Sequence, residues 1–342
     1  MKIGILTGGG DCPGLNCVIR AVTVVNFHNG VDTIGIRRGW RGLIEGDFFD
    51  VTPPMITGIH DKGGTILGSS RTNPLKDPAL LDRLKQNWKE ANLEGLIAVG
   101  GDDTLSISAA LTLEGMNVIG VPKTIDNDIG HTDYSFGFHT AVEVIMDSID
   151  RLRTTAEAHD RIIFLEVMGR NSGWIATYAG IAGGADLILV PEKPFDFDEI
   201  VEALQRRFAR GRQYANVVVA EGAIPKGMKE FITRGKQVDD FGHIQLGGVG
   251  EYLAQEIHQR MGIETRAVVL GHIQRGGSPV AFDRVLATRL GVRSAELARE
   301  GKWGVMVSLR GLDIETVPLS WAVESVNKLR DDFYEVAEQF FG

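Results

Sequence analysis

Residues Leu96–Thr104 read LIAVGGDDT, and residues Val118–Asp128 read VIGVPKTIDND. In each stretch a short apolar run, typical of a buried strand, is followed at once by glycine, proline or charged residues. Glycines let a backbone approach a phosphate closely, clustered carboxylates bind Mg2+, and a further carboxylate can accept a proton from a hydroxyl. The two stretches therefore predict strands whose ends carry the groups that phosphoryl transfer needs.

Apolar runs alternate with longer amphipathic stretches along the rest of the chain. Strands are predicted at Lys2–Thr7, Gly95–Val99, Val118–Val121, Ile162–Val167, Leu187–Val190, Val217–Ala220, Ala267–Leu270 and Val305–Val307. Helices are predicted at His139–Arg153 and around Glu251–Met261, whereas Gly222–Gly250 is predicted to be a surface excursion. This order predicts an α/β protein with largely parallel sheets, in which ligands bind beyond the carboxyl ends of the strands.

Length and charge narrow the possible functions. A chain of 342 residues predicts two domains, at roughly 100–200 residues each. The net charge of −9 argues against nucleic acid or an anionic membrane as a partner, so any phosphate site must be a local basic pocket. Cys12 and Cys17 are expected to be reduced, and no apolar run reaches the roughly 18 residues of a membrane span. We therefore expect a cytoplasmic protein.

The loop after the first predicted strand, Thr7–Asn16, reads TGGGDCPGLN and precedes an apolar helix. Free amides at the start of that helix can bind an anion. The loop does not match the dinucleotide fingerprint, because Pro13 stands at the position of its third glycine. No P-loop motif occurs in the chain, which excludes a P-loop nucleoside triphosphatase.

Cationic residues occur in or beside several of the predicted loops and strands. They are Arg71 in GGTILGSSR, Lys123 in PKTIDND, Arg161 and Arg170 on either side of Ile162–Val167, and Arg266, His272 and Arg275 in TRAVVLGHIQRGG. As a set they predict a binding site for a dianionic phosphate.

The motifs GGGDCPGLN, GGTILGSSR, GGDDT, PKTIDND, MGR and TRAVVLGHIQRGGSP together closely resemble those of the 6-phosphofructokinases, in order and in spacing. The resemblance runs from Met1 to beyond Arg284. It implies two unequal three-layer α/β/α domains: a larger donor-binding domain at 1–137 and 274–324, and a smaller sugar-phosphate-binding domain at 138–273 and 325–342. It also implies Mg2+-dependent phosphoryl transfer to the 1-hydroxyl of fructose 6-phosphate.

The resemblance further implies a role for each matching residue. Asp126 matches the general base, and Asp102 matches the carboxylate that binds Mg2+. Matches around the donor and the transferring phosphoryl group are Gly10, Arg71, Asp103, Lys123, Thr124, Asp128 and Arg170. Matches to sugar-phosphate contacts are Met168, Gly169, Glu221, His272 and Arg275. Arg161 and Arg266 match 6-phosphate ligands that come from a neighbouring subunit, so we expect a homodimer or homotetramer with shared active sites.

Departures from the family pattern bear on the phosphoryl donor. ATP-using bacterial members usually have glycine at the positions of Asp103 and Lys123, and this pair resembles the pyrophosphate-dependent branch. An aspartate at position 103 fills the space of the α-phosphate of ATP and repels its charge. Lys123 offers a cation to the shorter donor, pyrophosphate. Ile107 likewise stands where ATP-using members tend to have a small residue near the ribose.

The sequence leaves alternative functions open. One is an ATP-dependent 6-phosphofructokinase; another is a catalytically silent sugar-phosphate sensor, which need not retain Asp102 and Asp126. A lipid or NAD kinase has a similar GGD loop but does not account for the cations at positions 161, 266, 272 and 275.

Regulation by anionic effectors is expected to be weak. Arg20 and Arg153 match two cations of the effector pocket of bacterial ATP-dependent members, but Val24 and Pro53 occupy the positions of two others.

Overall fold

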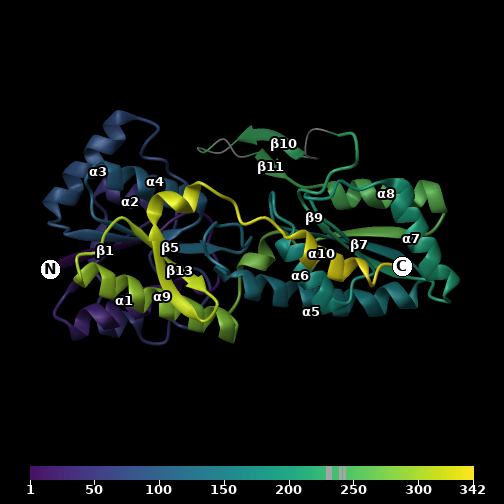
Figure 1. The fold of residues 1–342 in the computed structure, drawn as a ribbon, viewed down its shortest axis with the longest axis horizontal. Helices are drawn as coiled ribbons and strands as arrows, with labels where there is room; N and C mark the ends of the chain where they lie inside the picture. Colours follow the sequence, from purple (N-terminus) through teal and green to yellow (C-terminus); the bar gives the residue numbers. More distant parts are fainter. Residues whose placement is uncertain (229–232, 239–240, 242–243) are drawn as a thin grey trace.

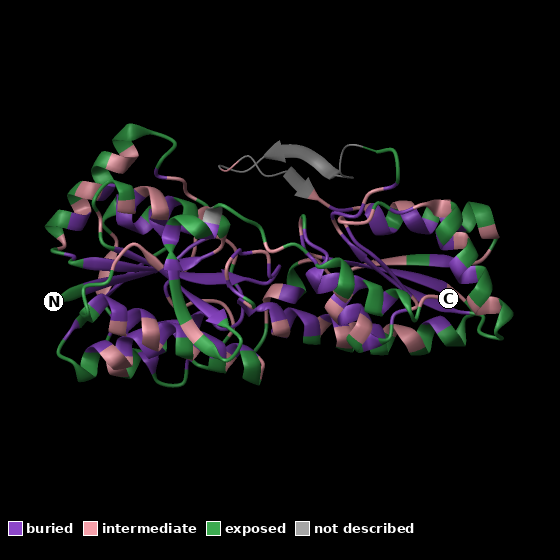
Figure 2. Cartoon of the chain, viewed as in Figure 1, coloured by how far each residue is buried: buried purple, intermediate pink, exposed green. Residues whose placement is uncertain are grey.

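A computed structural model describes residues 1–228, 233–238, 241 and 244–342. Two sheets lie side by side along the long axis of the molecule, and helices cover both faces of each (Figure 1). The strands are buried between helices whose outer faces are exposed (Figure 2). The fold is therefore of the α/β class with largely parallel sheets, as the sequence predicts.

The larger sheet has the order β14-β13-β5-β4-β1-β2-β3, with β6 paired to β5. Its strands are β1 (Lys2–Thr7), β2 (Asp32–Ile36), β3 (Phe48–Asp50), β4 (Gly95–Gly100), β5 (Val118–Thr124), β6 (Phe136–Gly137), β13 (Val305–Arg310) and β14 (Asp313–Pro318). The edge strands β3 and β14 are antiparallel to their neighbours, and the other pairs are parallel. Strand β2 lies on one side of β1 in the sheet, and β4 lies on the other side. The loops that follow β1 and β4 therefore meet at a topological switch point.

Helices on one face of the larger sheet are α1 (Leu15–His28) and α9 (Ala281–Arg299). The opposite face carries α2 (Trp40–Glu45), α3 (Pro78–Glu90) and α4 (Asp102–Leu113) (Figure 1). A short 3-10 helix, η1 (Pro53–Ile56), follows β3. All six residues of β4 are buried, which explains why its sequence is an unbroken apolar run rather than an alternating one.

The smaller sheet has the order β12-β7-β9-β8, and all of its pairs are parallel. Its strands are β7 (Ile162–Val167), β8 (Leu187–Leu189), β9 (Ala215–Ala220) and β12 (Thr265–Val269). The surrounding helices are α5 (Phe138–Ala158) and α6 (Trp174–Gly183) on one face and α7 (Phe197–Ala209) and α8 (Val249–Met261) on the other. The C-terminal helix α10 (Asp331–Glu338) contacts α6.

The chain passes between the two sheets three times in its described part. It enters the smaller sheet through α5, returns through the 3-10 helix η2 (Gly271–Arg275) to α9, and crosses again after η3 (Leu319–Val323) to reach α10. Hydrogen bonds secure the last crossing, because Asn327 Nδ2 donates to Asn127 O (2.8 Å) and Trp174 Nε1 donates to Asn327 O (3.0 Å). This crossing thereby joins the loop after β5 to the start of α6.

Each of the predicted strands is present, but some bounds differ. Strand β5 continues to Thr124 instead of ending at Val121, because Lys123 and Thr124 pair with Phe136 and Gly137 of β6. Strand β12 begins two residues earlier than predicted, at Thr265, where it pairs with Ile162.

The predicted surface excursion contains an antiparallel pair, β10 (Thr233–Val238) and β11 (Ile244–Leu246), and part of that stretch lies outside the described residues. The sequence does not predict β2, β3, β6 or β14. Cys12 and Cys17 are buried free thiols, as expected. Among the described residues, no helix combines the length and apolar character needed to cross a membrane.

Candidate active site

The carboxyl ends of the two sheets face each other, and contacts between their loops define the candidate site. Arg170, after β7, has its Nη1 3.8 Å from Asp102 Oδ2 at the start of α4. Arg275, in η2, donates through Nη1 to Asp11 O at 3.2 Å. Loops that follow strands of both sheets therefore contribute to one site, as parallel α/β sheets allow.

The glycine loop after β1 lies against two cations. Lys123 is 3% exposed, and its Nζ donates to Gly10 O at 2.5 Å. A Cβ atom at Gly10 would lie 2.6 Å from Arg275 Nη1, so a side chain there would displace this arginine. Burial lowers the pKa of Lys123. Its ammonium group forms no ion pair within the described part of the chain, although Asp126 and Asp102 lie close enough to favour its charged form.

The two carboxylates of the GGDDT motif lie in the first turn of α4. The Asp102 side chain is 54% exposed, and Asp103 is half-buried. Ile107 is 1% exposed and belongs to an apolar cluster with Leu105 and Leu111. Its side chain therefore packs in the core instead of lining an open site, and this differs from the expectation that it stands near a nucleoside.

The loop after β5 holds two carboxylates in low-dielectric surroundings. Asp126 is 8% exposed, its Oδ1 has no hydrogen-bond partner among the described residues, and its backbone N–H donates to Thr124 Oγ1 (3.1 Å). Burial raises the pKa of Asp126, although Arg275 and Arg170 oppose the shift. Burial, together with the neighbouring Asp126, raises the pKa of Asp128 to about 7. Between them Asn127 has φ 53°, a left-handed conformation that turns the loop.

The loop after β7 contains the predicted sugar contacts Met168, Gly169 and Arg170. Gly169 has φ 143° and Arg170 has φ 53°, so two successive residues adopt conformations that side chains disfavour. The Arg170 backbone N–H donates to Glu221 Oε1 (3.2 Å), at the end of β9. Burial is the main cause that raises the pKa of Glu221 to about 7, and Asp126 adds to it.

His272 and Arg275, two further predicted residues, lie in η2, and Arg71 lies in the larger sheet's part of the chain. His272 is exposed, whereas Arg275 is half-buried beside Gly10. Arg71 is exposed on the loop that precedes α3.

Arg161 and Arg266 do not join the other predicted site residues. They lie at the amino ends of β7 and β12, where both contact Glu264 Oε1, at 3.2 Å and 2.5 Å. Strand β7 has 6 residues, so at ~3.3 Å per residue its two ends are on the order of 16 Å apart. Within one chain these arginines therefore lie at the opposite end of the smaller sheet from Arg170.

Several residues that shape the site are not identified by the sequence. Gln274, within the GHIQRGG motif, is fully buried and accepts a hydrogen bond from Met168 N (3.1 Å). Asn327 contacts the loop of Asp126 from 200 residues away. Asp283 caps the start of α5, where it accepts from Thr140 N (2.7 Å) and Oγ1 (2.6 Å). The only sequence signal for Gln274 or Asp283 is an amide or carboxyl side chain within or next to a motif.

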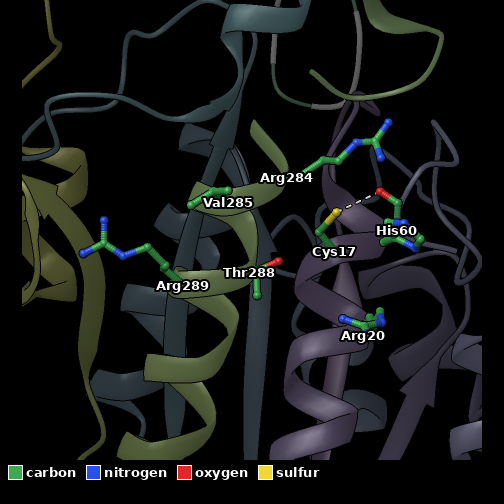
Figure 3. Close-up of a pocket in the computed structure, with 7 residues that line it drawn as sticks. All are labelled: Cys17, Arg20, His60, Arg284, Val285, Thr288 and Arg289. Carbon is green, nitrogen blue, oxygen red and sulfur yellow. Dashed lines mark hydrogen bonds between the residues drawn. The ribbon is translucent and has the colours of Figure 1, made fainter. Parts of the chain in front are cut away.

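A cavity of about 300 Å³ lies away from this site, between α1 and α9 (Figure 3). Arg20, one of the two residues that match an effector pocket, lines it together with Arg284 and Arg289. The Arg284 and Arg289 side chains extend in different directions from α9 (Figure 3). They donate to Pro279 O (2.6 Å) and Leu312 O (2.5 Å) respectively, so the arginines do not converge on one anion.

Glycine loops, buried carboxylates and cationic side chains at facing strand ends are the groups that a phosphoryl-transfer site needs. The sequence matches the family described as Phosphofructokinase over residues 2–298, and the chain belongs to this family. It is 52% identical over 344 residues to a pyrophosphate--fructose 6-phosphate 1-phosphotransferase of Amycolatopsis methanolica, with 100% of both chains covered. It is also 48% identical over 344 residues to ATP-dependent 6-phosphofructokinase 3 of Streptomyces coelicolor, with 99% of each covered.

A solved structure has the same fold. The crystal structure of Pichia pastoris phosphofructokinase in the T-state matches with a TM-score of 0.84 and 29% identity, covering 99% of this chain and 36% of that one. The family resemblance of the sequence motifs is thus confirmed.

Proposed function

We propose that the protein transfers a phosphoryl group from pyrophosphate to the 1-hydroxyl of fructose 6-phosphate, forming fructose 1,6-bisphosphate and phosphate in a reversible reaction. The observation that carries the proposal is the buried Lys123 ammonium beside the glycine loop, hydrogen-bonded to Gly10 O at 2.5 Å. A buried charge is costly unless an opposite charge compensates it. A pyrophosphate group on the glycine loop would supply that charge.

Asp103 favours pyrophosphate over ATP as the donor. It stands in the first turn of α4, one residue after Asp102, on the donor side of the site. A carboxylate at this position would repel the additional phosphate of a nucleotide, whereas pyrophosphate ends before reaching it. One of the two relatives is named for pyrophosphate and the other for ATP, so their names do not decide the donor. The Asp103–Lys123 pair is the reason to prefer pyrophosphate.

The chemical step is assigned to Asp126, which would accept the proton of the 1-hydroxyl as that oxygen attacks the terminal phosphorus. The bond to the bridging oxygen breaks, and orthophosphate leaves. Asp126 Oδ1 has no hydrogen-bond partner among the described residues, so it is able to accept this proton. Lys123 and Arg170 would stabilise the negative charge on the transferring group.

Mg2+ is the expected cofactor, and the donor set fits it. Among the described residues, no group of three or more His, Cys, Asp or Glu side chains could bind a metal ion without further ligands. Mg2+ usually binds one or two carboxylates together with substrate phosphate oxygens. The half-exposed Asp102 would be the carboxylate, and the ion would neutralise charge on the donor phosphates.

We further infer that the protein is a homo-oligomer with shared sites. Arg161 and Arg266 lie at the opposite end of the smaller sheet from Arg170, where they cannot reach the 6-phosphate in their own chain. They would instead bind the 6-phosphate in a neighbouring subunit. We also propose that residues 1–137 and 274–324 form the donor-binding domain, and that residues 138–273 and 325–342 form the sugar-phosphate-binding domain. Buried free thiols agree with a cytoplasmic location.

The reaction can be followed directly by 31P NMR. Purified protein is incubated with fructose 6-phosphate, Mg2+ and pyrophosphate, and in parallel with ATP in place of pyrophosphate. We expect the pyrophosphate signal to be replaced by those of orthophosphate and a sugar bisphosphate, and Asp126→Ala protein to leave the signals unchanged. Turnover of ATP without turnover of pyrophosphate would overturn the proposal in favour of the ATP-dependent alternative.

A further inference from the structure

Gln274 lies between two predicted sugar contacts, His272 and Arg275, and no function has been assigned to it. Its side chain is fully buried, and both polar atoms are used. Nε2 donates to Gly271 O at 2.9 Å, and Oε1 accepts from the backbone N–H of Met168 at 3.1 Å. The amide therefore links η2 to the loop after β7, across 106 residues of sequence.

The loop that Gln274 contacts is conformationally demanding. Gly169 has φ 143°, and Arg170 has φ 53°, a left-handed region that non-glycine residues disfavour. Glu221 Oε1 accepts from Arg170 N (3.2 Å), and Ser172 N donates to Gly169 O (2.8 Å). Gln274 and Glu221 thus bind two backbone donors of this loop, one on either side of Gly169.

We propose that Gln274 is a positioning residue for sugar-phosphate binding. By binding the Met168 N–H, it fixes the distance between the loop of Arg170 and the helix that carries His272 and Arg275. The two elements must be in register for one sugar phosphate to contact both. Gln274 itself need not touch the ligand.

Loss of the Gln274 hydrogen bond should lower the fraction of molecules in which the Met168–Arg170 loop can bind the sugar phosphate. A part-buried backbone donor left without a partner is destabilising, so the variant loop would leave its strained conformation more often. If only a tenth of the molecules hold the competent loop, the apparent dissociation constant rises about tenfold. Gln274 bonds to Gly271 and Met168, and Arg275 of the same helix keeps its own bond to Asp11 O in the loop after β1, so the change should fall mainly on the sugar phosphate.

The test uses the full-length protein with Gln274→Met, which keeps the approximate volume of the side chain but removes both hydrogen-bonding atoms. Ile273→Ala is the matched control, because Ile273 lies in the same helix and is 60% exposed. Fructose 6-phosphate binding is measured by titration calorimetry without donor, and KM values for sugar and donor are measured in steady state. Should Gln274→Met fail to fold, Gln274→Asn, which is one methylene shorter, replaces it.

We expect the Kd and KM for fructose 6-phosphate to rise about tenfold, with the donor KM changed less than about twofold and Ile273→Ala like wild type. Hydrogen exchange should also accelerate in the peptide containing Met168–Arg170, while β4 stays protected. Unchanged sugar affinity in the variant would overturn the inference, as would a loss confined to kcat and melting temperature.

The inference rests on the proposed function in one respect: it assumes that the ligand is a sugar phosphate. Wild-type protein that fails to bind fructose 6-phosphate would reject both. Wild-type protein that binds it, with an indistinguishable variant, would reject the role of Gln274 alone.

Discussion

Replacing Lys123 with methionine should lower activity without weakening the fold. Lys123 is 3% exposed and its ammonium group donates to Gly10 O at 2.5 Å, yet it forms no ion pair in the part of the chain that the structure describes. Methionine has a similar length and no charge. The substitution therefore removes one buried cation from the donor side of the site and leaves the packing of β5 nearly intact.

The size of the effect can be estimated from the hydrogen bond and the charge. A hydrogen bond between a charged group and phosphate contributes about 1.5–3 kcal/mol, and each 1.36 kcal/mol is a factor of ten in rate. We therefore expect kcat/KM for pyrophosphate to fall about 10–150-fold. The free energy of unfolding should stay constant or rise, because a buried unpaired charge has been replaced by an apolar group.

Steady-state kinetics and chemical unfolding of the same preparations measure both quantities. Lys85→Met is the control, since Lys85 is paired with Glu114 (2.9 Å) at the surface of α3 and should affect neither. A Lys123→Met protein with wild-type kcat/KM would show that the buried ammonium does not bind the donor. A marked loss of stability would show that the cation is structural.

Three other substitutions test separate parts of the site. Asp126→Ala should lower kcat about 10²–10⁴-fold while fructose 6-phosphate still binds in calorimetry, and near wild-type kcat would exclude it as the base. Glu221 has its pKa raised from 4.5 to about 7, so the folded state retains this proton and the free energy of unfolding should fall as pH rises through that interval. Glu221→Gln should flatten that dependence by on the order of 2 kcal/mol, and an identical urea-unfolding profile from pH 5 to 7.5 would contradict the assignment. Arg266→Ala should raise the KM for fructose 6-phosphate about 10–100-fold. Co-refolding it with Asp126→Ala protein should restore part of the activity, and hybrids confirmed by native mass spectrometry that remain inactive would place Arg266 in its own subunit's site.

The parts of the fold that the sequence predicts are those with a local signal. Strands such as β4 and β7 are buried on both faces and read as apolar runs, and the residues that follow them include predicted site residues. Strands at the sheet margin have weaker signals. Strand β3, for example, has three residues and none is fully buried. The two-residue β6 exists only as a partner of β5, which is why Lys123 and Thr124 proved to lie on a strand.

Contacts between distant residues could not be predicted in this way. The loop of Asp126 is hydrogen-bonded to Asn327, 200 residues later, and the Met168 loop is hydrogen-bonded to Gln274, 106 residues later. No local pattern of hydrophobicity or turn residues specifies such a partner. The burial of Ile107 has the same origin, since helical spacing alone does not say which side of α4 faces the core.

The most direct test of pyrophosphate as donor is a comparison of kcat/KM for pyrophosphate and for ATP, at saturating fructose 6-phosphate and Mg2+, on one preparation. Because Asp103 would repel the nucleotide and Lys123 is placed for the shorter donor, we expect pyrophosphate to be preferred by at least about 10²-fold. The variant Asp103→Gly with Lys123→Gly should lose most of that preference. An equal or greater kcat/KM for ATP in the wild-type protein would contradict pyrophosphate as the donor.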